Sequence, residues 1–170
     1  MESVTIREIQ KKDNLAIAAI VRGVLMEMGA PKVGTAYADP YLDTLFEVYD
    51  IPRAIYFVVE RDGKILGGAG IMQLDNADET ICELQKMYFL PEIRGLGFGT
   101  KLMNLCLEKA LEFGFDSCYI ETMTYMDAAL KLYRKSGFEY LEHQIGNTGH
   151  NSCEVWMLKK LKGRKNLFAI

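Results

Sequence analysis

A glycine-rich segment in the middle of the chain constrains the fold more than any other feature. The segment Pro91–Gly99 carries Gly95, Gly97 and Gly99 between an apolar strand-like run and an amphipathic helix-like run. The first N–H groups of a helix lack intrahelical partners, the helix dipole favours negative charge there, and glycine lets the backbone approach a ligand. The segment therefore predicts a strand–loop–helix unit that binds a phosphate or pyrophosphate.

The glycine spacing differs from two well-known phosphate-binding patterns. A P-loop requires G-x-x-x-x-G-K-[ST], which residues 95–101 do not supply. A dinucleotide fingerprint requires G-x-G-x-x-G in a parallel unit, whereas Gly99 comes one residue too soon and three antiparallel-looking strands precede it. The spacing alone leaves the nucleotide open, and a plain strand-to-helix turn is the competing interpretation.

Hydrophobic patterning predicts one α/β domain over residues 1–162 and a tail over residues 163–170. The sheet begins as an antiparallel meander and gains a strand-helix-strand crossover in its second half. Asp13 stands where it would cap the first helix. Helices are expected after Asp13 and over residues 41–49, about 97–113 and 127–135. Strands are expected over residues 4–7, 55–60, 65–72, 81–90, 117–122, 138–142 and 153–159.

The composition is that of a globular protein and excludes several functional classes. Hydrophobic residues make up 49% of the 170 residues, which is too many for a disordered chain. The 20 basic and 23 acidic side chains give a net charge of −3, so the chain has no general attraction for nucleic acid. The apolar runs are too short to cross a membrane, and the first residues do not resemble a signal peptide. We expect neither a nucleic-acid nor a membrane partner.

The four cysteines are widely spaced and form no C-x-x-C pair. Each lies in an apolar stretch, where free cysteine behaves as a small hydrophobic residue. We therefore expect buried thiols rather than disulfides or a zinc site, no bound metal, and a reducing cytoplasmic location. The cysteines are Cys82, Cys106, Cys118 and Cys153.

Two motifs, in this order, carry a family resemblance. Arg94-x-x-Gly97-x-Gly99 follows the strand-like stretch 84–92, and residues 129–138 read A-L-K-L-Y-R-K-S-G-F. The first motif resembles the R/Q-x-x-G-x-G/A signature of the GNAT superfamily of N-acetyltransferases, and the second resembles that family's A-x-x-L-Y-x-K-x-G-F helix and turn. The resemblance implies a GNAT-like α/β fold, with a mixed, mostly antiparallel central sheet of about six to seven strands flanked by about four helices.

The resemblance also implies acetyl-CoA as co-substrate. Its pyrophosphate would bind the N–H groups of the loop Arg94–Thr100, and its pantetheine arm would pair with the strand around Met87–Phe89, which splays from the strand 117–122. Many members carry Asn where this chain has Met126, so Thr124 or Asp127 is expected to replace one cofactor contact. The implied cofactor-binding residues are Met87, Phe89, Arg94, Gly95, Leu96, Gly97, Phe98, Gly99, Thr100 and Tyr133.

Acetyl transfer to an amine needs a base and an acid. An alkylamine has a pKa of about 10.4, so it arrives protonated, and the departing thiolate benefits from a proton donor. The resemblance suggests Glu83 as the base, acting directly or through water, and Tyr133 as the acid. The competing interpretations are an exposed strand carboxylate paired with a lysine, and a tyrosine that only packs on the sheet.

Two loops are expected to border the acceptor. The loops Gly29–Tyr41 and Gly146–Asn151 would flank it, with Tyr37, Tyr41 and Tyr49 either lining the pocket or packing. His150 is a second candidate base. A nucleophilic pair of His150 with Cys153 is conceivable, although a buried thiol is favoured. The other histidine is His143.

The resulting hypothesis is an enzyme that transfers acetyl from acetyl-CoA to a primary amine by direct attack in a ternary complex. A small-molecule acceptor is favoured over a protein N-terminus or lysine. The alternatives are a CoA-binding sensor without transferase activity and a binder of ATP or NAD. The apolar tail residues Leu167, Phe168 and Ile170 suggest a homodimer contact.

Overall fold

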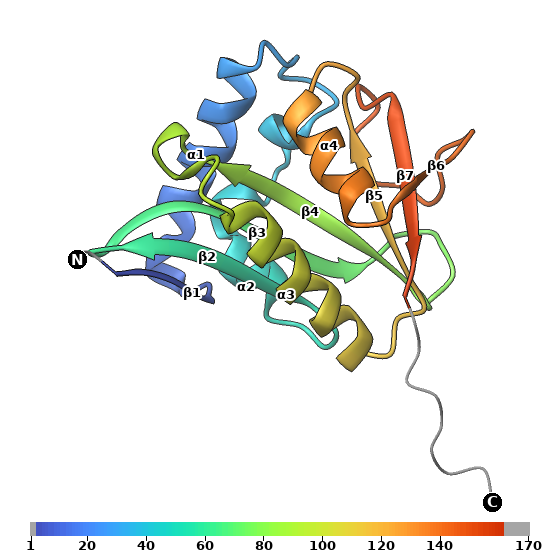
Figure 1. Ribbon diagram of the computed structural model, residues 1–170, viewed down its shortest axis with the longest axis horizontal. Helices are drawn as coiled ribbons and strands as arrows, with labels where there is room; N and C mark the ends of the chain where they lie inside the picture. Colours follow the sequence, from blue (N-terminus) through green and yellow to red (C-terminus); the bar gives the residue numbers. More distant parts are fainter. Residues whose placement is uncertain (1–2, 162–170) are drawn as a thin grey trace, which may run out of the picture.

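Seven strands form one sheet in the computed structural model, which describes residues 3–161 (Figure 1). Across the sheet their order is β1-β2-β3-β4-β5-β7-β6, and only β4 and β5 are parallel neighbours. The prediction of a mixed, mostly antiparallel sheet is confirmed. The strands are β1 (Val4–Glu8), β2 (Ile55–Arg61), β3 (Lys64–Gln73), β4 (Ile81–Phe89), β5 (Ser117–Thr122), β6 (Glu139–Tyr140) and β7 (Val155–Lys160).

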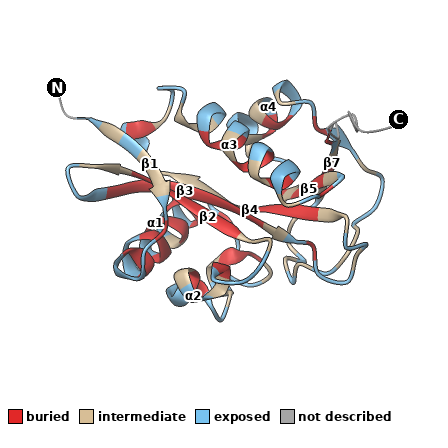
Figure 2. Cartoon of the chain, turned by 90° about the horizontal axis from the view of Figure 1, so that it is seen from below, coloured by how far each residue is buried: buried red, intermediate tan, exposed pale blue. Residues whose placement is uncertain are grey.

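Four α-helices cover the sheet in two layers. Figure 2 shows α1 and α2 against one face and α3 and α4 against the other. The helices are α1 (Asn14–Glu27), α2 (Leu45–Tyr49), α3 (Phe98–Glu112) and α4 (Asp127–Lys135). The tail over residues 163–170, with Leu167, Phe168 and Ile170, lies outside the described residues, as does the dimer contact predicted for it.

Each face of the sheet has its own hydrophobic core. On the α3–α4 side, Leu102, Cys106 and Ala110 of α3 are fully buried, as an amphipathic helix requires. Cys82 and Cys118 are buried beside them, and all four cysteines are free thiols. The expected burial is found for Cys82, Cys106 and Cys118, whereas Cys153 is half-buried.

Asp13 occupies the N-cap position of α1 but does not cap it. Its carboxylate accepts a hydrogen bond from the backbone N–H of Gln10 at 2.8 Å and pairs with Arg7 at 2.7 Å. The predicted cap is therefore wrong, because a neighbouring guanidinium and the preceding turn use both carboxylate oxygens.

Glycines in β3 make room for two tyrosines that reach the next strand. A Cβ on Gly70 would lie 2.5 Å from the ring of Tyr56 and 2.8 Å from the ring of Tyr49, so no larger residue fits. The Tyr56 hydroxyl donates to the backbone oxygen of Lys86 at 2.8 Å, and the Tyr49 hydroxyl donates to the Gln85 side chain at 2.6 Å. Small residues in β3 thus let α2 and β2 support the middle of β4.

A β-bulge divides β4 into two halves. Lys86 and Met87 both stand opposite the single β3 residue Ala69, and Lys86 has a positive φ of 50°. Before the bulge, Leu84 faces the α3–α4 core, and after it Met87 and Phe89 face that core. The extra residue reverses the alternation, so that even-numbered residues face this core before the bulge and odd-numbered residues face it after.

Candidate active site

The two parallel strands separate soon after they meet. β4 pairs with β5 only over residues 81–83 and 117–119, and the strands then splay toward the end at which α4 lies (Figure 1). A cavity of about 470 Å³ opens between them, lined by β4, β5, α4 and the glycine-rich loop. This is the splayed pair that the resemblance implied.

The N-terminus of α3 opens on this cleft without a cap. Gly97 occupies the N-cap position with φ 83°, Gly95 has φ 73°, and no side chain caps the helix. The first intrahelical bond of α3 runs from the Lys101 N–H to the Gly97 oxygen at 3.1 Å, so the N–H groups of Phe98–Thr100 precede it. These amides, with the helix dipole, form a binding site for an anionic group.

Arg94 ties the glycine-rich loop to its neighbours. Its Nε donates to the backbone oxygen of Phe89 at 2.8 Å, and its two terminal nitrogens donate to the carboxylate of Glu27 at 2.7 and 2.8 Å. All three guanidinium nitrogens thus have protein partners. Arg94 lines the cleft, but its contacts shape the loop rather than leave a free charge for a phosphate.

The structure brings most of the implied cofactor residues to the cleft. At the position where many relatives carry Asn, Met126 and the neighbouring Asp127 line the cleft. Leu96 lies in the loop with 61% of its surface exposed. Gly97, Phe98 and Thr100 belong to the start of α3 and offer their backbone rather than a cleft wall. The implied residues that line the cleft are Met87, Phe89, Arg94, Gly95, Gly99 and Tyr133.

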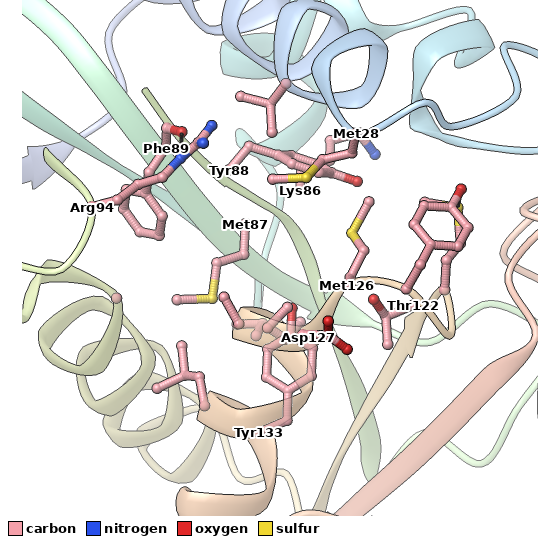
Figure 3. Close-up of a pocket in the computed structure, with 18 of the residues that line it drawn as sticks. Met28, Lys86, Met87, Tyr88, Phe89, Arg94, Thr122, Met126, Asp127 and Tyr133 are labelled. Atoms are coloured by element: carbon pink, nitrogen blue, oxygen red, sulfur yellow. Dashed lines mark hydrogen bonds between the residues drawn. The ribbon is translucent and has the colours of Figure 1, made fainter. Parts of the chain in front are cut away.

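Tyr133 reaches the cleft from α4. Figure 3 shows its ring rising from the helix into the pocket. The side chain is 7% exposed, and burial, with smaller contributions from Cys153 and Cys118, raises the pKa of its phenol well above its ordinary value. The hydroxyl therefore keeps its proton at neutral pH and is able to donate it.

Glu83 sits where the cleft begins. It pairs with Tyr119 in the last register position that β4 and β5 share, and it is 4% exposed. Gln85 Nε2 donates to its carboxylate at 2.5 Å. Burial raises the pKa of Glu83 to about 7, although Gln85 and the charges of His150 and Lys86 act in the opposite direction. The exposed-carboxylate interpretation is wrong.

A charged chain lies beside Glu83 on the α1 face of β4. Lys86 Nζ contacts Asp39 at 2.7 Å, and His150 Nε2 contacts the other Asp39 oxygen at 3.0 Å. Burial raises the pKa of Asp39, but the hydrogen bond from His150 and the charge of Lys86 outweigh it and bring that pKa down to about 2. Sequence reasoning missed Asp39 and Lys86, and the only signal was the polar run at residues 85–86 inside an apolar strand.

Glu121 is a further cleft residue that sequence reasoning missed. Its carboxylate accepts hydrogen bonds from Tyr119 and Gln144 at 2.7 Å and from Thr148 Oγ at 2.5 Å. Thr148 Oγ in turn accepts the N–H of His150 at 3.1 Å. Glu121 thereby attaches the loop before β7 to the strand that forms one wall of the cleft.

Cys153 lines the cleft, but it does not form a nucleophilic pair with His150. The His150 ring nitrogen Nε2 contacts Asp39, and the bond between the two residues runs from the Cys153 N–H to the His150 backbone oxygen at 3.0 Å. Burial, and then the carboxylates of Glu121, Glu83 and Asp39, raises the pKa of the thiol to about 12. The thiol is therefore protonated and poorly nucleophilic at neutral pH.

The predicted tyrosines have different surroundings. Tyr49 is buried and hydrogen-bonded to Gln85, Tyr37 is half-buried beneath the Lys32 ammonium, and Tyr41 is 67% exposed. Of the three, Tyr49 is the one linked to Glu83, through its hydrogen bond to Gln85.

Two negative findings apply to residues 3–161. No group of three His, Cys, Asp or Glu side chains within this range is arranged to hold a metal ion. Within the same range, no helix has the length and apolar character needed to span a membrane.

Comparison with known proteins agrees with this geometry. The model of the Acetyltransferase (GNAT) family matches residues 26–138. The Escherichia coli (strain K12) protein named "Uncharacterized N-acetyltransferase YjgM" is 45% identical over 161 residues, covering 94% of this chain and 96% of its own.

Two solved structures have the same fold. An acetyltransferase of the GNAT family from Staphylococcus aureus Mu50 superposes with a TM-score of 0.81 at 19% identity, over 94% of this chain and all of its own. The Salmonella typhimurium protein yncA, solved with its cofactor acetyl-CoA, superposes with a TM-score of 0.76 at 20% identity, over 99% of both chains. The two structures share the fold, and the family model and the relative at 45% identity show that this chain belongs to the GNAT family of acetyltransferases.

Proposed function

We propose that this protein transfers the acetyl group of acetyl-CoA to the primary amine of a small molecule by direct attack in a ternary complex. The observation that carries the proposal is the cleft that forms where β4 and β5 separate. This cleft has an anion-binding helix terminus at one end and a protonated phenol on one wall, and the buried carboxylate of Glu83 lies where the two strands begin to separate.

The cleft fits an extended ligand with an anionic group. The uncapped amides of Phe98–Thr100 would bind the pyrophosphate, and the free edge of β4 over Met87–Phe89 would pair with the pantetheine arm. A Cβ on Gly99 would lie 3.3 Å from Leu132, so a small residue keeps this passage open. Acetyl-CoA supplies an activated thioester carbonyl and a thiol leaving group.

Glu83 would act as the general base. A base works best when its pKa lies near the operating pH, and burial brings the pKa of Glu83 to about 7. Gln85, which Tyr49 holds in place, donates to one carboxylate oxygen and leaves the other as the proton acceptor.

Tyr133 would act as the general acid. Its phenol lies in the cleft and is protonated at neutral pH, so it holds a proton that the leaving thiolate can take up. The raised pKa of Cys153, about 12, supports direct attack by the amine rather than an acetyl-enzyme route.

A bridge between two loops supports a small acceptor. The Ser152 N–H donates to the Gly34 oxygen and its hydroxyl donates to the Val33 oxygen, both at 2.9 Å, while His150 contacts Asp39 at 3.0 Å. These contacts join the loop after α1 to the loop before β7, next to the ion pair of Asp39 and Lys86. Because these two loops are joined, the opening between them favours a small amine over a polypeptide that would have to lie across both loops.

Binding and turnover test the proposal in sequence. Titration calorimetry should give binding of acetyl-CoA but not of NADH or ATP. Release of CoA should then follow with one or more of ethanolamine, putrescine, phenethylamine and glycine, and more slowly with a lysine-containing peptide. Failure to bind acetyl-CoA would overturn the proposal. Binding without CoA release from any acceptor would identify a non-catalytic CoA-binding module, and a preference for the peptide would overturn the small-molecule acceptor.

We further propose that residues 1–162 form a single domain that works in the cytoplasm, and that the tail contributes to a homodimer. Truncation after Lys162 is then expected to reduce the mass measured in solution by light scattering. An unchanged mass would refute the dimer contact.

A further inference from the structure

The proposed mechanism leaves one proton to be removed. An amine that binds as an ammonium and leaves as an amide releases one proton more than the departing thiolate takes up. In the proposed function that proton goes to Glu83, which is 4% exposed and hydrogen-bonded to Gln85. Turnover therefore needs a group that carries the proton from this buried carboxylate to solvent.

His150 has the required position. Its ring is close enough to Glu83 to interact with that carboxylate electrostatically, and its side chain is 13% exposed, so it connects the interior with the surface. Its ring contacts Asp39 at 3.0 Å, and Asp39 also binds the ammonium of Lys86, which Figure 3 shows among the residues of the pocket. The imidazole is thus held by a carboxylate that is itself fixed to the bulge of β4.

We propose that His150, oriented by Asp39, is the proton outlet for Glu83. This inference rests on the proposed acetyl transfer. In each cycle the amine N–H bond breaks and the proton moves to the Glu83 carboxylate. The proton then moves, directly or through water, to the imidazole, which releases it to solvent while Glu83 returns to its carboxylate form.

The contact with Asp39 determines which ring atom takes the proton. Asp39 is ionised and accepts from Nε2, so Nε2 carries the hydrogen in the neutral imidazole. The lone pair is then on Nδ1, which is the atom that accepts the proton. Asp39 also stabilises the imidazolium that forms. His150 and Asp39 together have the arrangement of a general base and the group that orients it.

Asp39 contacts this imidazole directly, and charged groups of two strands lie near the pair. Asp39 lies in the loop before α2, Lys86 and Glu83 project from β4, and Glu121 projects from β5. Cys153 belongs to the same loop as His150 and stays a neutral thiol.

The loop holds His150 from both sides. Thr148, bound to Glu121, accepts the backbone N–H of His150, and two residues further on Ser152 binds the loop after α1. These bonds fix the backbone of the loop at His150, and the contact with Asp39 fixes the position of the ring.

Two substitutions separate proton transfer from structural support. His150→Gln keeps an amide N–H for Asp39 but carries no proton, so with the fastest acceptor of the panel above we expect kcat to fall by about 10- to 100-fold. His150→Ala leaves a cavity beside Asp39, and added imidazole should restore its kcat in a concentration-dependent manner. His143→Ala, at the exposed second histidine, is the matched control and should show neither loss nor rescue.

A tautomer measurement provides a readout independent of activity. In protein labelled with ¹⁵N-histidine, we expect His150 to carry its hydrogen on Nε2, with the signal assigned from its loss in the Gln variant. Wild-type kcat in His150→Gln, absence of imidazole rescue in a folded His150→Ala protein, or an Nδ1–H tautomer would each overturn the proton outlet. A wild-type protein that acetylates no amine would instead refute the proposed function.

Discussion

Glu27 binds both terminal nitrogens of Arg94, at 2.7 and 2.8 Å, and so joins the last turn of α1 to the glycine-rich loop. The third guanidinium nitrogen binds the backbone of β4 at Phe89. One side chain thereby fixes the glycine-rich loop against both β4 and α1. The loop geometry depends on this pair rather than on glycine alone.

Arg94→Glu should weaken acetyl-CoA binding by about tenfold or more, measured by calorimetry. The substitution removes the bond to Phe89 and sets two carboxylates against each other at Glu27, which displaces the loop. Glu27→Gln is the control, because it keeps a hydrogen-bond acceptor and should leave the affinity within a few-fold of wild type. Equal affinities in Arg94→Glu and wild type would contradict this role.

Glu83 should control the acid side of the pH–rate profile. The carboxylate must be ionised to accept a proton, so kcat/KM is expected to rise with pH through about 7 and then level off. Glu83→Gln should lower kcat by about 10²- to 10⁴-fold and remove this rise. A profile without a rise between pH 6 and 8, read in the buffers used for wild type, would argue against Glu83 as the base.

The same carboxylate should make stability fall with pH. Its pKa rises from 4.5 in the unfolded chain to about 7 in the fold, so the folded state binds more protons between these values. Ionising it in the fold above pH 7 costs roughly 3 kcal/mol, a penalty absent below pH 4.5. Glu83→Gln should therefore raise the free energy of unfolding in urea more at pH 8 than at pH 5.5. A pH-independent difference would mean that Glu83 is solvated in the fold.

Tyr133→Phe should lower kcat by about 10²-fold while leaving acetyl-CoA affinity near the wild-type value. The ring still fills its place against Phe138, and only the acidic proton is lost. Tyr140→Phe, at a tyrosine that is 54% exposed on β6, is the matched control and should retain full activity. A large drop in the melting temperature of Tyr133→Phe would instead indicate a packing role for the hydroxyl.

Two glycine-to-alanine substitutions should change the free energy of unfolding in opposite directions. Gly97 has φ 83° and open space where a Cβ would stand, so alanine there is strained only through its backbone and should cost about 1–2 kcal/mol of stability. Gly23 lies inside α1 with equally open space, and alanine there should stabilise by about 1 kcal/mol. Denaturant titration of both variants checks the pair, and a neutral Gly97→Ala would contradict the left-handed cap.

Local patterns explain what the sequence predicted. The strand before the glycine segment, the helix after it and α4 all follow from short-range spacing, and each is present within about two residues of its expected bounds. Tyr133 and Glu83 were singled out by the family resemblance. The burial of Glu83 was not predicted, because that depends on Gln85 and on Tyr49 from a helix much earlier in the chain.

Contacts between distant loops explain what the sequence did not predict. Asp39 and His150 are separated by 111 positions, and their contact depends on how two irregular segments cross the end of the sheet. The periodic spacing of hydrophobic residues predicts helices and strands, but it does not predict where two irregular loops meet. The failed cap at Asp13 has the same origin, since Arg7 of the first strand competes for the carboxylate.

Because of the bulge at Lys86, the side of the sheet that each β4 residue faces depends on an exact residue count along the strand. Upstream of the bulge, Leu84 faces the α3–α4 core and Glu83 faces the opposite side of the sheet, and downstream, Met87 and Phe89 face that core. Removing one residue between these halves would exchange the faces of every residue that follows, so that Met87 and Phe89 would leave the α3–α4 core. We therefore expect a single insertion or deletion in this nine-residue strand to be as disruptive as the replacement of its buried residues.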